Sequence, residues 1–366
     1  MLFEDQFRRP ESAARLLELI GARSTRLPSV RIMEVCGTHT MSIAKSGLRQ
    51  LLPRNIELVS GPGCPVCVTP APAMDEVLRL AALPGVTLAT YGDLMRVPGS
   101  VRGDDLRRRK ALGADVRVVY SPMDALAIAQ QEPQRQVIFL GVGFETTAPG
   151  TALTVLEAQR QGVSNFFLLS LLKRTPPALH ALAAQSTLNI DAFLCPGHVA
   201  TILGADAFRF LPEQYALSAV VAGFETGDLL AAIAMLLGQL QQGTAKLENE
   251  YTRAVSPTGN PAALAVMEQV FAPDDDLWRG LGTIADSALR LREEFSAHDA
   301  AKQFDFCPAE RCAPTPCRCG DVICGHIAPE QCPLFGAACT PEDPVGPCMV
   351  SGEGSCAAAY HYGRTS

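Results

Sequence analysis

Short apolar runs alternate with helix-like stretches from about residue 30 to residue 245, and this alternation restricts the possible folds more than any other feature. Most of the runs end in a turn that contains glycine. Strands that alternate with helices form parallel sheets covered by helices on both faces. Runs that are apolar at nearly every position are typical of strands buried on both sides. The sequence therefore predicts an α/β fold with parallel sheets.

The predicted strands are 31–35, 56–60, 86–90, 115–120, 136–142, 166–172, 191–195 and 218–223. The predicted helices are 74–83, 122–131, 150–161, 176–185 and 227–242. Eight strands can form one large sheet or two smaller ones. Two sheets are favoured because 141–156 and 221–236 share a plan of strand, Gly-Phe-Glu-Thr and helix. Coincidence within a common strand–turn–helix pattern explains this echo equally well.

A chain of 366 residues is long enough for two or three domains. We expect a helical segment at 1–29 that packs on the C-terminal part, α/β domains at 30–132 and 133–245, and a helical, cysteine-rich domain at 246–366. Within the last range the pattern predicts helices at 261–271 and 284–296.

Composition limits the classes of partner and location. The net charge of −7 and the lack of a long basic run argue against a nucleic-acid-binding surface. The first residues are charged and lack the apolar region of a secretory signal. Polar residues 225–228 interrupt the most apolar stretch, 217–240, which therefore predicts a strand, a turn and a buried helix rather than a membrane span. We expect a cytoplasmic protein that binds neither nucleic acid nor membranes.

Chemically distinctive residues follow several of the predicted strands. Ligands and catalytic groups collect at the carboxyl ends of parallel strands, so the sequence predicts one rim of functional side chains. The predicted rim residues are Cys36, His39, Cys64, Cys67, Asp93, Glu145, Cys195 and His198. Glu145, like Glu225, is also placed to cap a helix.

Cys36 lies where a predicted strand passes into a helix, and free N–H groups and the helix dipole stabilise a thiolate there. His39 is a second ligand, a proton donor or a cap, and burial in the core stays open for both residues. Cys64-Pro65-Val66-Cys67 has the Cys-x-x-Cys spacing of redox thiols. Zinc would need a second, regular pair. A reversible disulfide or a thiolate site for a soft metal fits better.

Nine of the thirteen cysteines lie between Cys307 and Cys356, in a segment rich in Pro and Gly. Such a segment cannot bury enough side chains to fold alone, so disulfides or metal must hold it. Cytoplasmic thiols stay reduced, which favours metal binding or redox chemistry over static disulfides. No Cys-x-x-Cys occurs there, which disfavours zinc ribbons, whereas iron–sulfur clusters use looser spacings.

Seven sequence blocks spread over nearly the whole chain resemble the HypD family of hydrogenase maturation proteins. The blocks are MEVCGTHT, GPGCPVC, YSPMDAL, GFETTAPGTA, PGHV, VAGFE and CPLFGAACTPEDPVGPCMVSGEGSCAA. The resemblance implies two α/β domains and a third, small domain that holds a [4Fe-4S] cluster. It also implies assembly of the Fe(CN)2CO fragment of [NiFe] hydrogenases in a complex with the chaperone HypC. HypE delivers the cyanide, and the hydrogenase large subunit is an indirect partner.

The resemblance also assigns residues. The family's cluster spacing falls on Cys317, Cys332, Cys339 and Cys356. Cys319 competes with Cys317 as the first ligand, and if Cys317 ligates, Cys319 and Cys348 are free to form a redox pair. Cys307, Cys312 and Cys324 match no family position.

The family's iron-binding and redox cysteines map onto Cys36, Cys64 and Cys67, with His39 beside the first. Soft thiolates suit iron that carries cyanide and carbon monoxide. Glu353 either tunes the cluster or passes protons, or is only a turn residue. His198 and Glu145 complete the expected supporting residues.

Two functions compete at this point. The first is a maturation scaffold with redox activity, since no hydrolase or transferase motif is present. The second is a cluster-dependent thiol/disulfide oxidoreductase similar to ferredoxin-dependent thioredoxin reductases. Cys36 with His39 favours the scaffold, because a pure dithiol reductase needs no third rim thiol.

Overall fold

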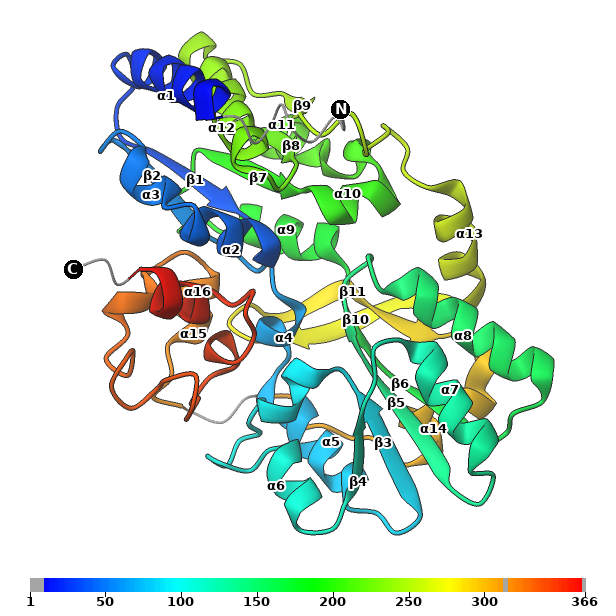
Figure 1. Cartoon of the computed structure of the whole chain (residues 1–366). Coiled ribbons are helices and arrows are strands. Elements are labelled where there is room, and N and C mark those ends of the chain that lie inside the picture. Colours follow the sequence, from blue (N-terminus) through cyan, green and yellow to red (C-terminus); the bar gives the residue numbers. More distant parts are fainter. Residues whose placement is uncertain (1–9, 312–314, 364–366) are drawn as a thin grey trace.

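The computed structural model describes residues 10–311 and 315–363. Two parallel sheets with their helices form the α/β part, and a cysteine-rich C-terminal unit lies against it (Figure 1). The α/β class with parallel sheets, predicted from the alternation of strands and helices, is confirmed. Among the described residues, no helix is both long and apolar enough to cross a membrane.

The first sheet has five parallel strands in the order β2-β1-β7-β8-β9. The strands are β1 (Val30–Glu34), β2 (Ile56–Ser60), β7 (Ala192–Pro196), β8 (Ser218–Ala222) and β9 (Leu247–Asn249). Ile32 and Leu194 share a core with one helical layer, whereas Met33 and Phe193 face the other core. The layer beside Ile32 contains α1 (Pro10–Ser24), α2 (Gly37–Lys45), α3 (Leu48–Leu51) and α12 (Thr226–Gln242). Helix α1 packs along α12.

The second sheet has four parallel strands in the order β4-β3-β5-β6. The strands are β3 (Val86–Thr90), β4 (Asp115–Val118), β5 (Gln136–Gly143) and β6 (Phe166–Leu172). Phe139 and Leu168 pack with α7 (Pro122–Gln131) and α8 (Ala148–Gln161) on one face. Ile138 and Leu169 share the core on the other face with α5 (Ala71–Ala81) and α9 (Thr175–Ala183).

The two sheets interleave along the chain. β1 pairs with β2 on one side and with β7 on the other, so residues 30–60 share a sheet with residues 192–249. The intervening strands form the other sheet. The predicted ranges 30–132 and 133–245 therefore differ from the division between sheets. Pairing of strands distant in sequence decides which sheet a strand joins, and a local apolar pattern carries no information about that pairing.

Both sheets contain a point at which the strand order reverses. The chain passes from β1 to β2 on one side and later places β7 on the other side of β1; β3, β4 and β5 repeat this arrangement. Ligand sites in such sheets form outside the carboxyl ends of the strands at this reversal. The topology therefore directs attention to the residues after β1, β7, β3 and β5.

The predicted helix at 284–296 is wrong. Strands β10 (Phe271–Trp278) and β11 (Gly282–Leu291) form an antiparallel hairpin, and a 3-10 helix, η4 (Glu293–His298), follows. The helix-forming residues of 284–291 adopt a strand because the hairpin packs beside β6, where Ser170 Oγ donates to Leu289 O at 2.6 Å. The preceding helix, α13 (Pro261–Val270), confirms the prediction at 261–271.

The remaining helical elements are short. They are α4 (Pro65–Val68), η2 (Gly92–Arg96), α6 (Leu106–Ala111), α10 (Gly197–Leu203), η3 (Ala205–Phe208), α11 (Phe210–Tyr215), α14 (Ala300–Gln303), α15 (Cys319–Ile323), η5 (Pro329–Gln331), η6 (Pro347–Met349) and α16 (Ser355–Tyr362).

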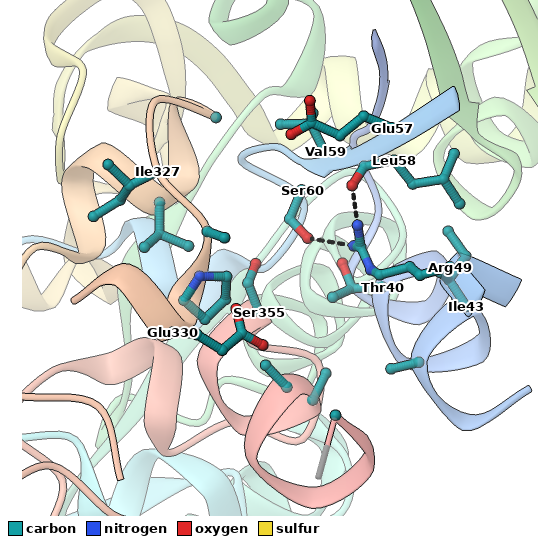
Figure 2. Close-up of a pocket in the computed structure, with 18 of the residues that line it drawn as sticks. Thr40, Ile43, Arg49, Glu57, Leu58, Val59, Ser60, Ile327, Glu330 and Ser355 are labelled. Carbon is teal, nitrogen blue, oxygen red and sulfur yellow. Dashed lines mark hydrogen bonds between the residues drawn. The ribbon is translucent and has the colours of Figure 1, made fainter. Parts of the chain in front are cut away.

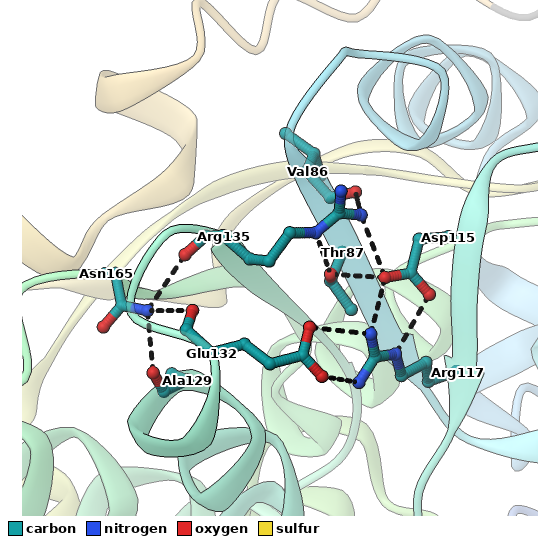
Figure 3. A network of polar contacts seen from close by, with 8 residues as sticks. All are labelled: Val86, Thr87, Asp115, Arg117, Ala129, Glu132, Arg135 and Asn165. Carbon is teal, nitrogen blue, oxygen red and sulfur yellow. Dashed lines mark hydrogen bonds and ion pairs between the residues drawn. The ribbon is translucent and has the colours of Figure 1, made fainter.

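A network of charged groups ties the strands of the second sheet together away from their carboxyl ends (Figure 3). Asp115 accepts hydrogen bonds from Thr87, Arg117 and Arg135 at 2.7–2.9 Å. Arg117 also pairs with Glu132. The Arg117 hydrogen bond, together with its neighbours, lowers the pKa of Asp115 to about 2. These contacts leave the opposite end of the sheet free to carry a site.

Candidate functional site

A cleft of about 480 Å3 lies where the strand-order reversals of the two sheets face each other. Its walls come from the residues after β1, β2, β3, β5 and β7, and from the cysteine-rich unit. Its polar and reactive lining includes Cys36, Thr38, Tyr91, Asp93, Tyr120, Thr146, Thr147, His198 and Glu353. The rim predicted from strand ends therefore exists, although only Cys36, Asp93 and His198 of its predicted members line the cleft.

Cys36 is held at the start of α2 by a close approach of two loops. It is the N-cap residue of the helix, and the N–H of Gly37 donates to Gly63 O at 2.8 Å. A side chain at Gly63 would collide with the Cys36 backbone, so only glycine fits there. Burial raises the pKa of the Cys36 thiol to about 12, and the N–H groups of His39 and Thr38 offset only part of this rise.

Glu353 reaches the cleft from the cysteine-rich unit. Its carboxylate accepts a 2.6 Å hydrogen bond from Thr38 Oγ1. Gly37 allows this approach, because a Cβ there would lie 2.5 Å from the Cβ of Glu353. The C-terminal unit thus supplies one wall of the cleft.

His39 does not line the cleft. Its Nε2 lies 3.0 Å from Gly223 O and 3.2 Å from Ala222 O, so Nε2 carries the proton that these carbonyls accept. Burial lowers the pKa of His39 to about 4. Phe224 lies next to both histidines, with ring centroids 5.0 Å from His39 and 3.7 Å from His198. Of the roles considered for His39, the structure therefore favours a buried side chain that is hydrogen-bonded to the end of β8 and the turn after it.

Cys64 and Cys67 lie just behind the cleft lining, since Gly63, Pro65 and Val66 line the cleft and the two thiols do not. Cys64 is the N-cap residue of α4, with Pro65 in the first turn, and its sulfur accepts from the Cys67 N–H at 3.2 Å. Both are buried, and burial raises the pKa of Cys67 well above its usual value. All twelve described cysteines are free thiols; Cys312 lies outside the described residues.

The dithiol contacts the cysteine-rich unit directly. Helix α4 packs against η6, and the Cys348 thiol of η6 lies near enough to Cys67 to affect its pKa; Cys348 also interacts with Cys319 and Cys356. Cys319 in turn interacts with Cys317. An uninterrupted series of thiols therefore runs from Cys64 to Cys317.

Six cysteines line one pocket in the C-terminal unit. They are Cys317, Cys319, Cys332, Cys339, Cys348 and Cys356. Apolar side chains, among them Val322 and Leu334, form the remaining walls. The pocket is narrow, with about 10 Å3 free. No three His, Cys, Asp or Glu side chains of the described residues are grouped to hold a single metal ion.

Other predicted residues have different surroundings. Glu145 is buried and accepts from the N–H and the hydroxyl of Thr175 at 2.7 and 2.8 Å, which fixes the start of α9. Cys195 is buried in β7 within the core. Cys324 is buried with its sulfur 3.5 Å from Gly280 O, and Cys307 is exposed.

Sequence reasoning missed Tyr91, Tyr120 and Phe144 as cleft residues. Tyr91 directly follows β3, so the rule of strand ends was sufficient to find it. Tyr120 fell inside a predicted strand that ends two residues earlier, at Val118.

A second, larger hollow of about 530 Å3 lies on the outer side of α2, between β2 and the C-terminal unit (Figure 2). Arg49 crosses it and donates to Leu58 O and, at 3.3 Å, to Ser60 Oγ. Its lining contains no cysteine. The thiols therefore belong to the cleft side of α2.

Comparison with known proteins decides the family. A family model named HypD and described as "Hydrogenase formation hypA family" matches residues 11–363. The chain belongs to the HypD family. The hydrogenase maturation factor HypD of Azotobacter vinelandii is 45% identical over 370 residues, which cover 100% of this chain and 97% of that protein.

Two further HypD-family relatives extend this similarity. The hydrogenase maturation factor HypD of Escherichia coli (strain K12) is 45% identical over 368 residues, with 99% of this chain and 98% of that protein covered. A putative hydrogenase expression/formation protein of Methanocaldococcus jannaschii is 41% identical over 348 residues, with 95% and 96% covered. The resemblance carried by the seven HypD-like blocks is confirmed.

Proposed function

We propose that this HypD-family chain acts in hydrogenase maturation as the scaffold and redox protein on which the Fe(CN)2CO fragment is assembled. The observation that carries this proposal is the contact between Cys67 and Cys348, which joins the thiols behind the cleft lining to those of the C-terminal pocket. A protein that only bound a partner would have no need for two thiol sites in contact.

The substrate iron binds in the cleft through Cys36. A thiolate is a soft ligand and suits low-spin iron with cyanide and carbonyl ligands. The cleft volume of about 480 Å3 leaves ample room for such a small fragment. His198 lies in the same lining and supplies a polar group toward its diatomic ligands.

The dithiol serves as a two-electron store. Reduction of a disulfide between Cys64 and Cys67 takes up two electrons and two protons, and a cluster in the C-terminal pocket would supply the electrons one at a time. Alternatively, Cys67 attacks a disulfide between Cys348 and Cys319; Cys64 then displaces Cys348, leaving one new disulfide and two thiols. The contacts of Cys348 with both Cys67 and Cys319 favour this exchange.

The C-terminal pocket fits a [4Fe-4S] cluster by its donors, although its free volume is small. Cys332, Cys339 and Cys356 converge there with either Cys317 or Cys319, and apolar walls surround them. These four residues would hold the cluster, which when bound supplies single electrons at low potential. The chain's own residues keep water out and hold Cys348 beside the ligands.

We place the HypC docking surface at the mouth of the cleft, where both proteins reach the iron. Tyr120 lines the mouth and is 93% exposed, and the apolar residues Val118 and Met123 beside it are also exposed. Exposed aromatic and apolar groups are typical of interface centres. HypE, as the cyanide donor, must approach the same opening, and the hydrogenase large subunit receives the product.

A second candidate function is a cluster-dependent thiol/disulfide oxidoreductase. The same contact between Cys67 and Cys348 favours it. The position of Cys36 separates the two functions, because this thiol lines the open cleft whereas Cys67 does not.

Complementation tests the proposal in cells that lack their own HypD-family protein. The wild-type chain and Cys307→Ala, which changes an exposed thiol outside both sites, should restore hydrogenase activity. Cys36→Ala and Cys348→Ala should not. Full restoration by Cys36→Ala, together with disulfide reductase activity of the isolated protein, would support the oxidoreductase instead.

A further inference from the structure

The turn of the β10–β11 hairpin reaches the segments that carry the thiol sites. Figure 1 shows the hairpin between the two sheets, with its turn close to α4 and to the cysteine-rich unit. Gly280 in this turn has a φ of 82°, and a Cβ there would lie 2.5 Å from the Cα of Gly320. The turn therefore touches the backbone directly after Cys319.

Arg279, the residue before that glycine, is bound to the helix that carries Cys67. Its N–H donates to Val68 O at 2.9 Å, and its Nε donates to Thr69 O at 3.1 Å. These carbonyls lie at the end of α4. The hairpin turn thus connects the dithiol helix to the segment that contains Cys317 and Cys319.

The charge of Arg279 has no carboxylate partner. The residue is only 9% exposed, and no ion pair from it to an Asp or Glu occurs within residues 10–311 and 315–363. A guanidinium stays protonated in proteins, and a buried unpaired charge is costly. The contact of the turn with Gly320 places this residue beside the segment that carries Cys317 and Cys319.

We propose that Arg279 is the counter-ion of the six-cysteine pocket and a positioning residue for the dithiol helix. Its guanidinium balances the negative charge of thiolates, or of a cluster held by them, while its hydrogen bonds to Val68 and Thr69 keep Cys67 beside Cys348. The expected effect on redox potential rests on the proposed function, because it requires a bound cluster. The position of the Arg279 charge beside the cysteines does not depend on a cluster.

Two substitutions separate charge from hydrogen bonding. Arg279→Lys keeps the charge and loses the planar fork, whereas Arg279→Gln loses the charge and keeps a donor. Arg318→Gln is the matched control, since Arg318 lies between Cys317 and Cys319 in sequence but is half exposed and paired with Asp321 at 2.8 Å. Thermal unfolding of each variant shows whether it is folded.

The first readout is the midpoint potential of the reconstituted [4Fe-4S] protein, from a titration followed by EPR. Losing a nearby positive charge makes reduction harder. We expect Arg279→Gln to shift the equilibrium about tenfold toward the oxidised form, or 59 mV for one electron, with Arg279→Lys and Arg318→Gln close to the wild type. Equal potentials in all four proteins would overturn the counter-ion role, whatever the unfolding temperatures.

The second readout needs no cluster. In metal-free protein at one fixed pH, mass spectrometry follows iodoacetamide labelling of Cys317 and Cys319. We expect severalfold slower labelling in Arg279→Gln than in the wild type and Arg279→Lys. If the wild type cannot be loaded with a cluster but the labelling rates still differ in this way, the proposed cluster is wrong and the counter-ion role of Arg279 stands. Unchanged labelling in Arg279→Gln would defeat the assignment.

Discussion

The hydroxyl of Thr38 donates a 2.6 Å hydrogen bond to the carboxylate of Glu353, although the two residues are 315 positions apart in the chain. Thr38 follows Cys36 by two residues, and Glu353 precedes Cys356 by three. This bond therefore joins the first turn of α2, next to the candidate iron ligand, to the turn that precedes a candidate cluster ligand. A substitution that breaks this bond on one side should therefore also alter the position of the segment on the other side.

Removing the Thr38 hydroxyl should weaken this junction. Thr38→Val deletes one hydrogen bond to a carboxylate and should lower the free energy of unfolding by about 1–3 kcal/mol. Urea unfolding of the purified protein measures the change. Thr25→Val, which removes an exposed local hydrogen bond to Ala22 O, is the control and should change little. Equal stabilities of the two variants would contradict a structural role for the junction.

Cys339→Ala should remove the cluster. We expect the anaerobically purified wild type to be brown with about four irons per chain, and Cys339→Ala to be nearly colourless, with a more protease-sensitive C-terminal unit. Iron and sulfide analysis with EPR after reduction measures this. Cys307→Ala should keep the full iron content. Stoichiometric zinc in the wild type, or no iron after anaerobic reconstitution, would count against the cluster.

Cys64→Ala and Cys67→Ala should each abolish hydrogenase maturation and leave the iron content of the C-terminal pocket unchanged. The reason is that these thiols form the dithiol but do not line that pocket. Mass spectrometry after alkylation should show a disulfide between them on mild oxidation of the wild type. If both thiols stay fully alkylatable, or if the double alanine variant still matures hydrogenase, the redox role is wrong.

Lys173 should give the protein a specific pH dependence. It is 1% exposed and bound to Asp276 at 2.7 Å, yet burial lowers its pKa from 10.5 to about 8. Between pH 8 and 10.5 the unfolded chain binds more protons at this lysine than the folded protein does, so its contribution to stability rises with pH. The full rise is about 3 kcal/mol.

Comparison with Lys173→Met isolates this effect, because the cysteines titrate alike in both proteins. Urea unfolding in reducing buffer at pH 7.5 and 9.5 should show the wild type gaining stability relative to the variant at the higher pH. Parallel changes in the two proteins would show that the lysine has an ordinary pKa.

Eight of the nine strands of the two sheets could be predicted because each is locally distinctive, whereas the three-residue strand β9 was missed. Residues 56–60, 86–90 and 166–172 are apolar runs bounded by turns, and their ends agree with the structure. The hairpin was missed because Ala, Leu and Arg in 284–291 favour helix locally, whereas its strand form depends on tertiary contacts such as the one from Ser170 to Leu289.

The candidate site was predictable to the extent that strand ends define it. Cys36, Asp93 and His198 were found by that rule, because a side chain just past a strand end often faces the opening. The same rule wrongly placed Glu145 and Cys195 in the cleft lining, because the direction in which a side chain points near a strand end depends on the packing around it. The contact of Cys67 with Cys348 joins distant segments, and no spacing in the sequence indicates it.

The infrared spectrum of the chain purified anaerobically with HypC, its proposed partner, tests the central claim most directly. Cyanide and carbon monoxide stretches fall where protein does not absorb. The wild type and Cys307→Ala should show both kinds of band. Cys36→Ala should still copurify with HypC, because interface area and metal ligation are separate contributions, but should lack the bands. Bands of wild-type intensity in Cys36→Ala would contradict assembly of the iron fragment on Cys36.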